Sequence, residues 1–253
     1  MTGASSKSKS VPAAGRWPMP EAAAAAGTAK RSRRKRAATY TLFGSMGSGS
    51  AAIEAALERC GAPYRIVNAA SWEPDSALAE LERINPLRQI PALVLADGNV
   101  LTENAAILIH LGLAFPASGL LPADACARDQ AIRGLVFISA NCYAAISVID
   151  YPERWCDGAS EAMQERVRRG TRARLHRHWD IFADMLPTPG ALHGGDAPGA
   201  LDLLATVVSK WCGARAHLQQ SRPAFFALLG RVESHPAVAP VFARHWPGEA
   251  PAS

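Results

Sequence analysis

Two neighbouring segments decide the fold: Asn85-Pro86-Leu87-Arg88-Gln89-Ile90-Pro91-Ala92-Leu93-Val94 and Leu101-Thr102-Glu103-Asn104-Ala105-Ala106-Ile107. Pro91 has no backbone N–H to give to a sheet ladder, so we expect it at the first residue or on the edge of a strand. With a cis Ile90–Pro91 bond, the backbone N–H and C=O of Ile90 would point outward, ready to pair with an extended ligand as an added strand does. A trans bond is the general expectation for such a pair. The first segment therefore predicts a strand start beside a site for a peptide-like ligand.

The residues after Pro91 predict a hairpin that leads straight into a helix. Residues 92–95 are apolar and of strand length, Asp97-Gly98 is a tight-turn pair, and Val100-Leu101 is typical of a returning strand. Residues 102–104 stand where the cap and first turn of the next helix belong. Free N–H groups and the positive dipole end at such a terminus favour a carboxylate. The same polar residues can also serve only as a cap.

The order of these pieces resembles the glutathione-binding, thioredoxin-like domain of the cytosolic glutathione S-transferase superfamily, in its bacterial beta-like or serine-type forms. Residues 40–43 resemble the first strand, 51–60 the first helix and 61–67 the start of the second strand, while 85–93 match the segment Asn-Pro-x-x-x-[Val/Ile]-Pro. The close match covers about residues 39–115. The resemblance implies an α/β thioredoxin-like N-terminal domain over 39–115, a linker over 116–124, and an all-α C-terminal domain over 125–248.

The resemblance also implies which residues bind glutathione as a co-substrate. Ile90 would pair its backbone with the cysteinyl unit, with the bond to Pro91 cis. Glu103 and Asn104 would hold the γ-glutamyl amine and carboxylate. The family usually carries Ser where Asn104 stands, and an amide side chain plus its backbone N–H can still donate to a carboxylate. The predicted glutathione-binding residues are therefore Ile90, Pro91, Glu103 and Asn104.

A hydrogen-bond donor for the sulfur is sought in residues 44–50, Gly-Ser-Met-Gly-Ser-Gly-Ser, here called the serine loop. A transferase needs such a donor because the thiolate is the nucleophile and a free thiol is mostly protonated at neutral pH. When this loop is aligned with beta-type relatives, the position of their active-site Cys falls on Gly49 and that of their Tyr falls on Gly44. This chain therefore lacks both side chains. A flexible Gly/Ser turn with a serine cap is the competing interpretation. The remaining candidate catalytic hydroxyls are Ser48, Ser50 and Ser45, the first two being favoured.

Beyond residue 124 the apolar spacing predicts helices over 128–148 and 160–186 and another within 194–211. Residues 223–231 and 236–245 complete the resemblance to the family's C-terminal helices. In the family, a buried helix of this domain opens with a Ser/Thr-x-x-Asp capping box, and the matching residues here are Gly199 and Asp202. Glycine lacks only the side-chain acceptor, so the expected cost is a few tenths of a kcal/mol.

The helical domain should supply the pocket for the second substrate. If the helix over 128–148 aligns with the beta-type pattern, Asn141 and Tyr143 face the cleft, and Tyr143 stands where those relatives carry a histidine. The phenol can hydrogen-bond the thiolate or simply pack in the core, and both alternatives stay open. The predicted co-substrate-binding residues are Asn141 and Tyr143.

Composition narrows the class of protein. The 253 residues with 49% hydrophobic content suffice for two modest domains. No uninterrupted apolar run approaches the roughly 20 residues of a membrane-spanning helix, which predicts a soluble, cytoplasmic protein without membrane contact. The five cysteines are scattered, without a CxxC pair or a Cys/His cluster, so we expect reduced thiols and no metal.

The first 38 residues differ from the rest and are predicted to be a disordered basic extension. They hold nine basic residues and one acidic residue, whereas the whole chain has a formal charge of +5, so the remainder is net negative. The basic run 30–36 can contact nucleic acid or anionic lipid, or be only a solvated tail. A net negative globular part gives no electrostatic case for nucleic acid as a partner.

The sequence thus predicts a glutathione S-transferase-like enzyme in which the thiolate attacks an apolar electrophile. A homodimer and a detoxification role are implied by the family alone. Two alternatives remain: a non-catalytic glutathione-binding or interaction protein, which the missing Tyr and Cys favour, and a glutathione-dependent peroxidase or disulfide reductase. The missing loop Cys argues against thiol–disulfide chemistry on the protein.

Overall fold

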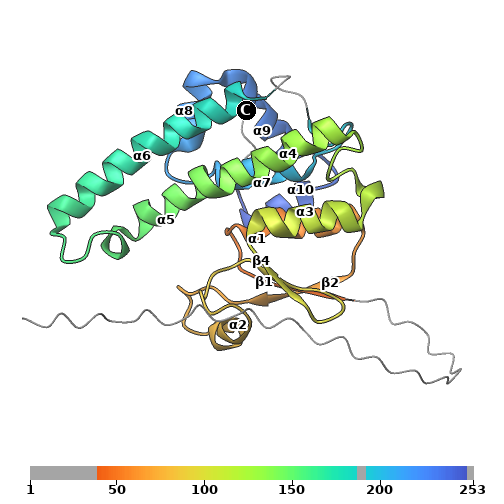
Figure 1. Cartoon of the computed structure of the whole chain (residues 1–253), viewed down its shortest axis with the longest axis horizontal. Helices are drawn as coiled ribbons and strands as arrows, with labels where there is room; N and C mark the ends of the chain where they lie inside the picture. The colour runs from red at the N-terminus through yellow and green to blue at the C-terminus, as the bar shows by residue number, and fades with distance from the viewer. Residues whose placement is uncertain (1–38, 187–191, 250–253) are drawn as a thin grey trace, which may run out of the picture. The chain divides into compact units, whose positions relative to one another are not determined.

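The two quoted segments build one side of a mixed sheet (Figure 1). The structure is a computed structural model that describes residues 39–186 and 192–249, so the predicted basic extension lies outside the described residues. Within that part the sheet has four strands in the order β2-β1-β3-β4. β1 runs parallel to β2 and antiparallel to β3, and β3 pairs antiparallel with β4. The bounds are β1 (Tyr40–Gly44), β2 (Tyr64–Asn68), β3 (Ala92–Val94) and β4 (Val100–Thr102).

Helices cover both faces of the sheet. α1 (Ser50–Cys60) and α3 (Asn104–Ala114) lie on one face, and α2 (Leu78–Ile84) lies on the other (Figure 1). All five residues of β1 are buried, because a strand covered on both faces has no wet side. Leu81 of α2 packs against Phe43 of β1 and Ala92 of β3 in a small second cluster. Leu81 alone is fully buried in this helix, and Leu78 and Ile84 are partly buried against the same cluster. This apolar stripe spans only seven residues, and α2 was not predicted.

The hairpin and the helix after it form where the sequence predicts them. The Ile90–Pro91 bond is cis, as the resemblance implies, and pairing of β3 with β1 begins at Ala92, just beyond Pro91. Gly98 has φ 91° in the turn between β3 and β4. α3 begins at Asn104 with Glu103 at its N-cap position, and no side chain caps it. The interpretation of these polar residues as a simple side-chain cap is therefore wrong.

The rest of the chain is helical. The predicted helix over 128–148 is a longer one that changes pitch: α4 and α5 are joined by a π-helical turn, η2. α8 was not predicted, because only Ala214 and Leu218 of its eight residues are buried. The bounds are η1 (Pro116–Ser118), α4 (Ala125–Phe137), η2 (Ile138–Tyr143), α5 (Ala144–Asp150), η3 (Pro152–Arg154), α6 (Glu161–Asp184), α7 (Ala200–Val208), α8 (Ala214–Ser221), α9 (Pro223–Ser234) and α10 (Ala239–His245).

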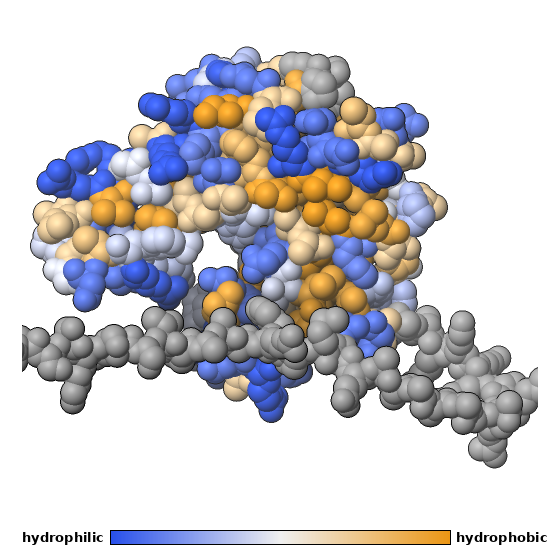
Figure 2. All heavy atoms as spheres, viewed as in Figure 1, coloured by the Kyte–Doolittle hydropathy of each residue, from blue (hydrophilic) through white to orange (hydrophobic). Residues whose placement is uncertain are grey.

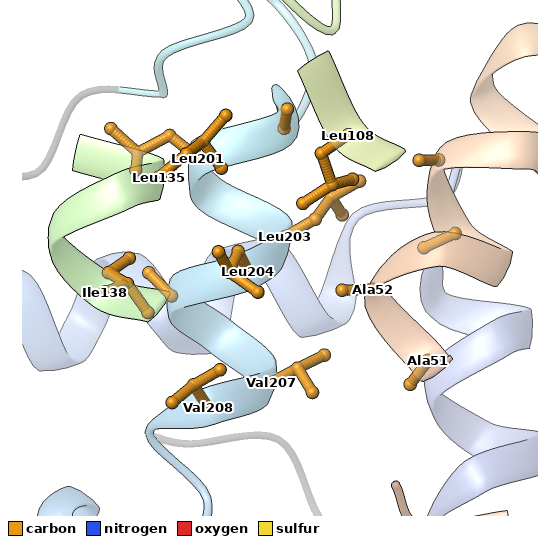
Figure 3. Packing of buried hydrophobic residues seen from close by; sticks show 14 of the residues in the cluster. Ala51, Ala52, Leu108, Leu135, Ile138, Leu201, Leu203, Leu204, Val207 and Val208 are labelled. Atoms are coloured by element: carbon orange, nitrogen blue, oxygen red, sulfur yellow. The ribbon is translucent and has the colours of Figure 1, made fainter. Parts of the chain in front are cut away.

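α7 is the centre of the core that joins the α/β part to the helical part. All nine of its residues are buried. In Figure 3, Leu201 lies beside Leu135 of α4, whereas Leu203 points toward Leu108 of α3 and Val207 toward α1. A helix that contacts neighbours all round is hydrophobic all round. The two parts therefore share one continuous hydrophobic cluster.

One described helix, Ala125–Asp150, is long and apolar enough to pass the length and composition test for a membrane span. Its residues Leu135 and Ile138 have no exposed surface and pack in the shared core. Core helices of proteins without a membrane pass the same test. This helix therefore has a packing role inside the fold.

Candidate functional site

A cavity of about 1050 Å³ opens between the sheet edge and the helical part. Figure 2 shows the molecule hollowed here, between the outer ends of α5 and α6 and the part that carries the sheet. The predicted site residues that line it are Ser48, Ile90, Pro91, Glu103, Asn104 and Tyr143. Three other predicted site residues, Ser45, Ser50 and Asn141, do not line this cavity. Asn141 instead turns its Nδ2 back to the carbonyl oxygen of Phe137, at 3.1 Å.

Asn85 shapes the loop that presents Ile90. Its Nδ2 donates to the carbonyl oxygen of Gln89 at 2.8 Å, and its Oδ1 accepts from the N–H of Leu87 at 3.2 Å. Its own carbonyl oxygen accepts from the N–H of Arg88, which has φ 56°. Within residues 39–186 and 192–249, neither the N–H nor the C=O of Ile90 has a hydrogen-bond partner. This free backbone pair on the cavity wall can take an extended ligand as an added strand.

Glu103 and Asn104 present the start of α3 to the same cavity. Glu103 has φ 66° and ψ 116°, a backbone region that costs free energy for any residue other than glycine and that persists mostly at functional sites. Asn104 is buried, and its Oδ1 has no hydrogen-bond partner. An unpaired buried acceptor costs about 1–3 kcal/mol, so a ligand that donates to it is favoured. The free N–H groups of the first turn attract an anionic group beside it.

The hydroxyls of the serine loop are bonded to one another. Ser48 Oγ and Ser50 Oγ are 2.8 Å apart, and they lie 2.7 and 3.0 Å from the carbonyl oxygen of Ser45. Ser45 Oγ donates to Glu73 Oε1 at 2.9 Å. These bonds close the loop onto the start of α1. Of the three, Ser48 alone lines the described cavity, a distinction that the sequence could not make.

The buried carboxylate of Glu54 supports the serine loop from behind, through His245. The N–H of Gly47 donates to His245 Nδ1 at 3.2 Å, and His245 Nε2 lies 2.7 Å from Glu54 Oε2. Arg244 Nε donates to Glu54 Oε1 at 3.1 Å. Sequence reasoning missed this contact. Its one signal was an acidic residue inside the otherwise apolar run 51–57, all of which is buried.

The pH dependence of stability should report this contact. Burial alone would raise the pKa of Glu54, but hydrogen bonds from His245 and Arg244 outweigh it and hold the pKa below 4.5. A carboxyl with a lowered folded-state pKa contributes stability above its unfolded pKa and loses it as the pH falls through the folded pKa. The free energy of unfolding, measured by urea titration between pH 3 and 7, should therefore fall below about pH 4.5. Glu54→Gln should remove part of this fall, and an unchanged acid limb in that variant would contradict the assignment.

Tyr143 reaches the cavity from the end of the π-helical turn η2. A Cβ atom added at Gly49 would overlap the Tyr143 hydroxyl, so the phenol fills the space of a missing side chain. The ring stacks on Trp211 with centroids 5.7 Å apart and planes at 18°. Burial raises the pKa of Tyr143 to about 12, against smaller lowering effects of hydrogen bonding by the Asn104 side chain and the Gly49 backbone. The phenol is therefore protonated at neutral pH.

The outer wall of the cavity combines aromatic, apolar and charged residues. The Arg154 guanidinium lies 3.9 Å above the Tyr151 ring, and Asp150 adds a carboxylate whose pKa burial raises. The large apolar and aromatic residues of the wall are Trp72, Leu87, Ile146, Tyr151, Trp155 and Trp211. Within residues 39–186 and 192–249, no group of three His, Cys, Asp or Glu residues is arranged to hold a metal ion.

Comparison with known proteins agrees with this geometry. Residues 50–113, which run from α1 through the cis-proline to α3, match the family model described as glutathione S-transferase, N-terminal domain. The Uncharacterized GST-like protein YncG of Escherichia coli (strain K12) is 34% identical over 128 residues, which cover 50% of this chain. Residues 50–113 are thus similar to the N-terminal domain of glutathione S-transferases. The matched stretch spans 62% of YncG, less than two thirds of that relative.

Solved structures of glutathione transferases share the fold over most of the chain. A glutathione transferase homolog from Sulfitobacter with bound glutathione has a TM-score of 0.68 at 23% identity, covering 81% of this chain and 97% of that one. A sphingomonad glutathione S-transferase complexed with glutathione has a TM-score of 0.62 at 25% identity, covering 80% and 96%. These likenesses confirm the thioredoxin-like α/β domain followed by an all-α domain.

Proposed function

We propose that the protein binds glutathione and transfers it to an apolar electrophile. The observation that carries the proposal is that unpaired backbone groups line one cavity: the N–H and C=O of Ile90, and the free first turn of α3 at Asn104. A tripeptide with a free amine and carboxylate at one end offers a partner for each. The solved relatives whose names include bound glutathione support the same ligand.

The bound tripeptide would lie along the sheet edge. Its cysteinyl unit pairs with Ile90, its γ-glutamyl amine donates to Asn104 Oδ1 and Glu103, and its γ-glutamyl carboxylate takes the N–H groups at the start of α3. The sulfur then lies toward Ser48 and Gly49, at the N-terminus of α1. The positive end of that helix lowers the pKa of a thiol placed there.

The second substrate would occupy the aromatic half of the cavity. The volume of about 1050 Å³ is at the upper end of ligand sites and leaves room beyond a tripeptide. The thiolate forms a carbon–sulfur bond with the electrophile, and a leaving group such as halide departs with the bonding electrons. A cytoplasmic homodimer with a detoxification role is part of this proposal through the superfamily, and light scattering would test the dimer.

Asn104→Leu tests the glutathione site. The variant keeps the side-chain size but removes the acceptor, so the Kd for glutathione should rise roughly 10-fold or more, given about 1.5–3 kcal/mol for a hydrogen bond to a charged group. The free energy of unfolding should fall by only about 0.5–1.5 kcal/mol, because the removed Oδ1 is unpaired without ligand and the variant loses the hydrogen bond of the Asn104 amide to Tyr143. Isothermal titration calorimetry measures the first and urea titration the second.

Asn99→Ala is the matched control for this experiment. Asn99 lies in the exposed β3–β4 turn and bonds only Asp97 through its Nδ2, so its glutathione Kd should equal that of the unmodified protein. A protein that binds no glutathione at millimolar concentration would overturn the proposed function. Equal Kd values for both variants would overturn the placement at Asn104.

The second candidate function is a non-catalytic glutathione-binding protein. It is favoured by the engagement of the Ser45 and Ser50 hydroxyls within the serine loop and by the glycine at position 49. Turnover on a panel of aryl halides and hydroperoxides separates the two functions. Glutathione binding without turnover on any member of the panel would favour the non-catalytic function. Disulfide reductase chemistry on the protein lacks support, since no cysteine is among the described residues that line the cavity.

A further inference from the structure

We propose that Tyr143, from the helical part, donates the hydrogen bond that stabilises the glutathione thiolate, in the space left by the missing side chain of Gly49. The proposal rests on the proposed function, because it concerns the sulfur of the bound tripeptide. Of the two roles that the sequence left open for Tyr143, it chooses the hydrogen bond to the thiolate, in place of the predicted hydroxyls Ser48, Ser50 and Ser45.

The two residues fit each other sterically. A Cβ atom at position 49 would overlap the phenol oxygen and come within 2.9 Å of the ring atom that carries it. Real Cβ atoms essentially never approach that closely, so any side chain at 49 excludes this position of the phenol. The hydroxyl therefore stands directly at the N-terminal end of α1.

The phenol is set up as a donor. With its pKa raised to about 12 by burial, it keeps its proton at neutral pH. Hydrogen bonds from the Asn104 side chain and the Gly49 backbone lower the pKa of the phenol. A hydrogen bond lowers the pKa of an acid when it is donated to the acid's oxygen, so both groups are donors. No described residue accepts its proton, and even the neighbouring Asn104 Oδ1 is left unpaired. The O–H is thus free for an anionic ligand atom in the cavity.

The position of the ring is fixed by structure outside the sheet. η2 ends at Tyr143, and such π-helical turns shift the register of a helix and are frequent at functional sites. Stacking on Trp211 holds the plane of the ring. In the reaction the thiol loses its proton to solvent, the phenol keeps its own and donates it as a hydrogen bond, and the sulfur electron pair forms the bond to carbon.

Tyr143→Phe tests the assignment with a readout besides turnover. The pKa of the thiol in bound glutathione, followed by thiolate ultraviolet absorbance, should rise by about 1 unit or more, since a hydrogen bond to a charged group contributes about 1.5–3 kcal/mol. At neutral pH, kcat/KM should fall roughly 10–100-fold, and the loss should shrink as the pH rises above the thiol pKa. The Kd of glutathione measured below the thiol pKa should change less than about threefold.

Gly49→Ala gives a second, independent variant that retains the tyrosine. The added methyl group must displace the phenol, so the same rise in thiol pKa is expected. In the Tyr143→Phe background, Gly49→Ala should add little, because the two changes remove one interaction. Gly170→Ala is the control, because Gly170 lies in α6 with nothing within 4 Å of an added Cβ. The thiol pKa of glutathione bound to this variant should equal that in the unmodified protein.

The outcomes separate the two proposals. Absence of glutathione binding in the unmodified protein would overturn the proposed function, and this inference with it. Normal binding with an unchanged thiol pKa in Tyr143→Phe would overturn this inference alone and leave the phenol as a packing residue. A rise in thiol pKa in Ser48→Ala but not in Tyr143→Phe would return the role to the serine loop.

Discussion

Glu54→Ala is expected to lower the free energy of unfolding by about 3 kcal/mol or more, since a hydrogen bond to a charged group contributes about 1.5–3 kcal/mol and the Glu54 carboxylate accepts from two side chains. The Glu54 side chain is buried in the middle of α1 and bonds His245 and Arg244 of α10. Without the carboxylate, those two groups lose their acceptor inside the protein. Because His245 Nδ1 also accepts from the N–H of Gly47, the serine loop should loosen and the Kd of glutathione should rise.

Urea unfolding followed by circular dichroism measures this effect. Glu58→Ala is the matched control, since Glu58 lies one turn further along α1, is exposed, and is 3.5 Å from Arg244 Nη2. An exposed ion pair contributes about 0–1 kcal/mol, so its removal should change little. Equal losses for the two variants would show that the buried contact between α1 and α10 has no special weight.

Asp202→Ala is expected to lower the free energy of unfolding by about 3 kcal/mol, since each buried donor left unpaired costs about 1–3 kcal/mol. Asp202 Oδ2 accepts from the N–H groups of Gly199 and His193, both at 2.8 Å, and its Oδ1 lies 2.7 Å from His193 Nδ1. Asp202 therefore holds the segment before α7 as well as the helix start. The helix that joins the two domains depends on this carboxylate.

The prediction of a weakened capping box at α7 needs a physical correction. A Cβ atom at Gly199 would lie 2.9 Å from the backbone nitrogen of Gly194, so the usual Ser or Thr has no room. The other half of the box is intact, since Asp202 accepts from the N–H of Gly199, and its two contacts with His193 are additional. Asp202→Asn, which keeps one acceptor oxygen, should lose less stability than Asp202→Ala.

Thermal and urea unfolding would check the Asp202 variants. Asp196→Ala is the control, because Asp196 lies in the same segment with an exposed side chain, and exposed substitutions usually stay within about 0.5 kcal/mol. A loss of less than 1 kcal/mol for Asp202→Ala would contradict the role assigned to the carboxylate.

The sequence determined the features that depend on local chemistry. Pro91 fixed the start of β3, the Asp97-Gly98 pair fixed the turn, and the apolar periods located α1, α3 and the long helices. The order of these pieces identified the fold class, which the comparisons confirm. Each of these signals depends on residues that are close together in the sequence, so the sequence alone is enough to recognise it. The short helices α2 and α8 bury too few residues to leave such a signal.

The tertiary structure alone decided which groups meet at the start of α1. The sequence offered three serines there, but the folded loop bonds Ser45, Ser48 and Ser50 to one another and to Glu73. The phenol of Tyr143, 94 positions beyond Gly49 in the printed sequence, fills the space instead. A space left by a glycine has no signature in sequence, because what fills it depends on how two distant helices pack. The sequence thus located the cavity wall at Ile90 and Asn104, and the packing of the helical part decided that the Tyr143 phenol lies at the start of α1.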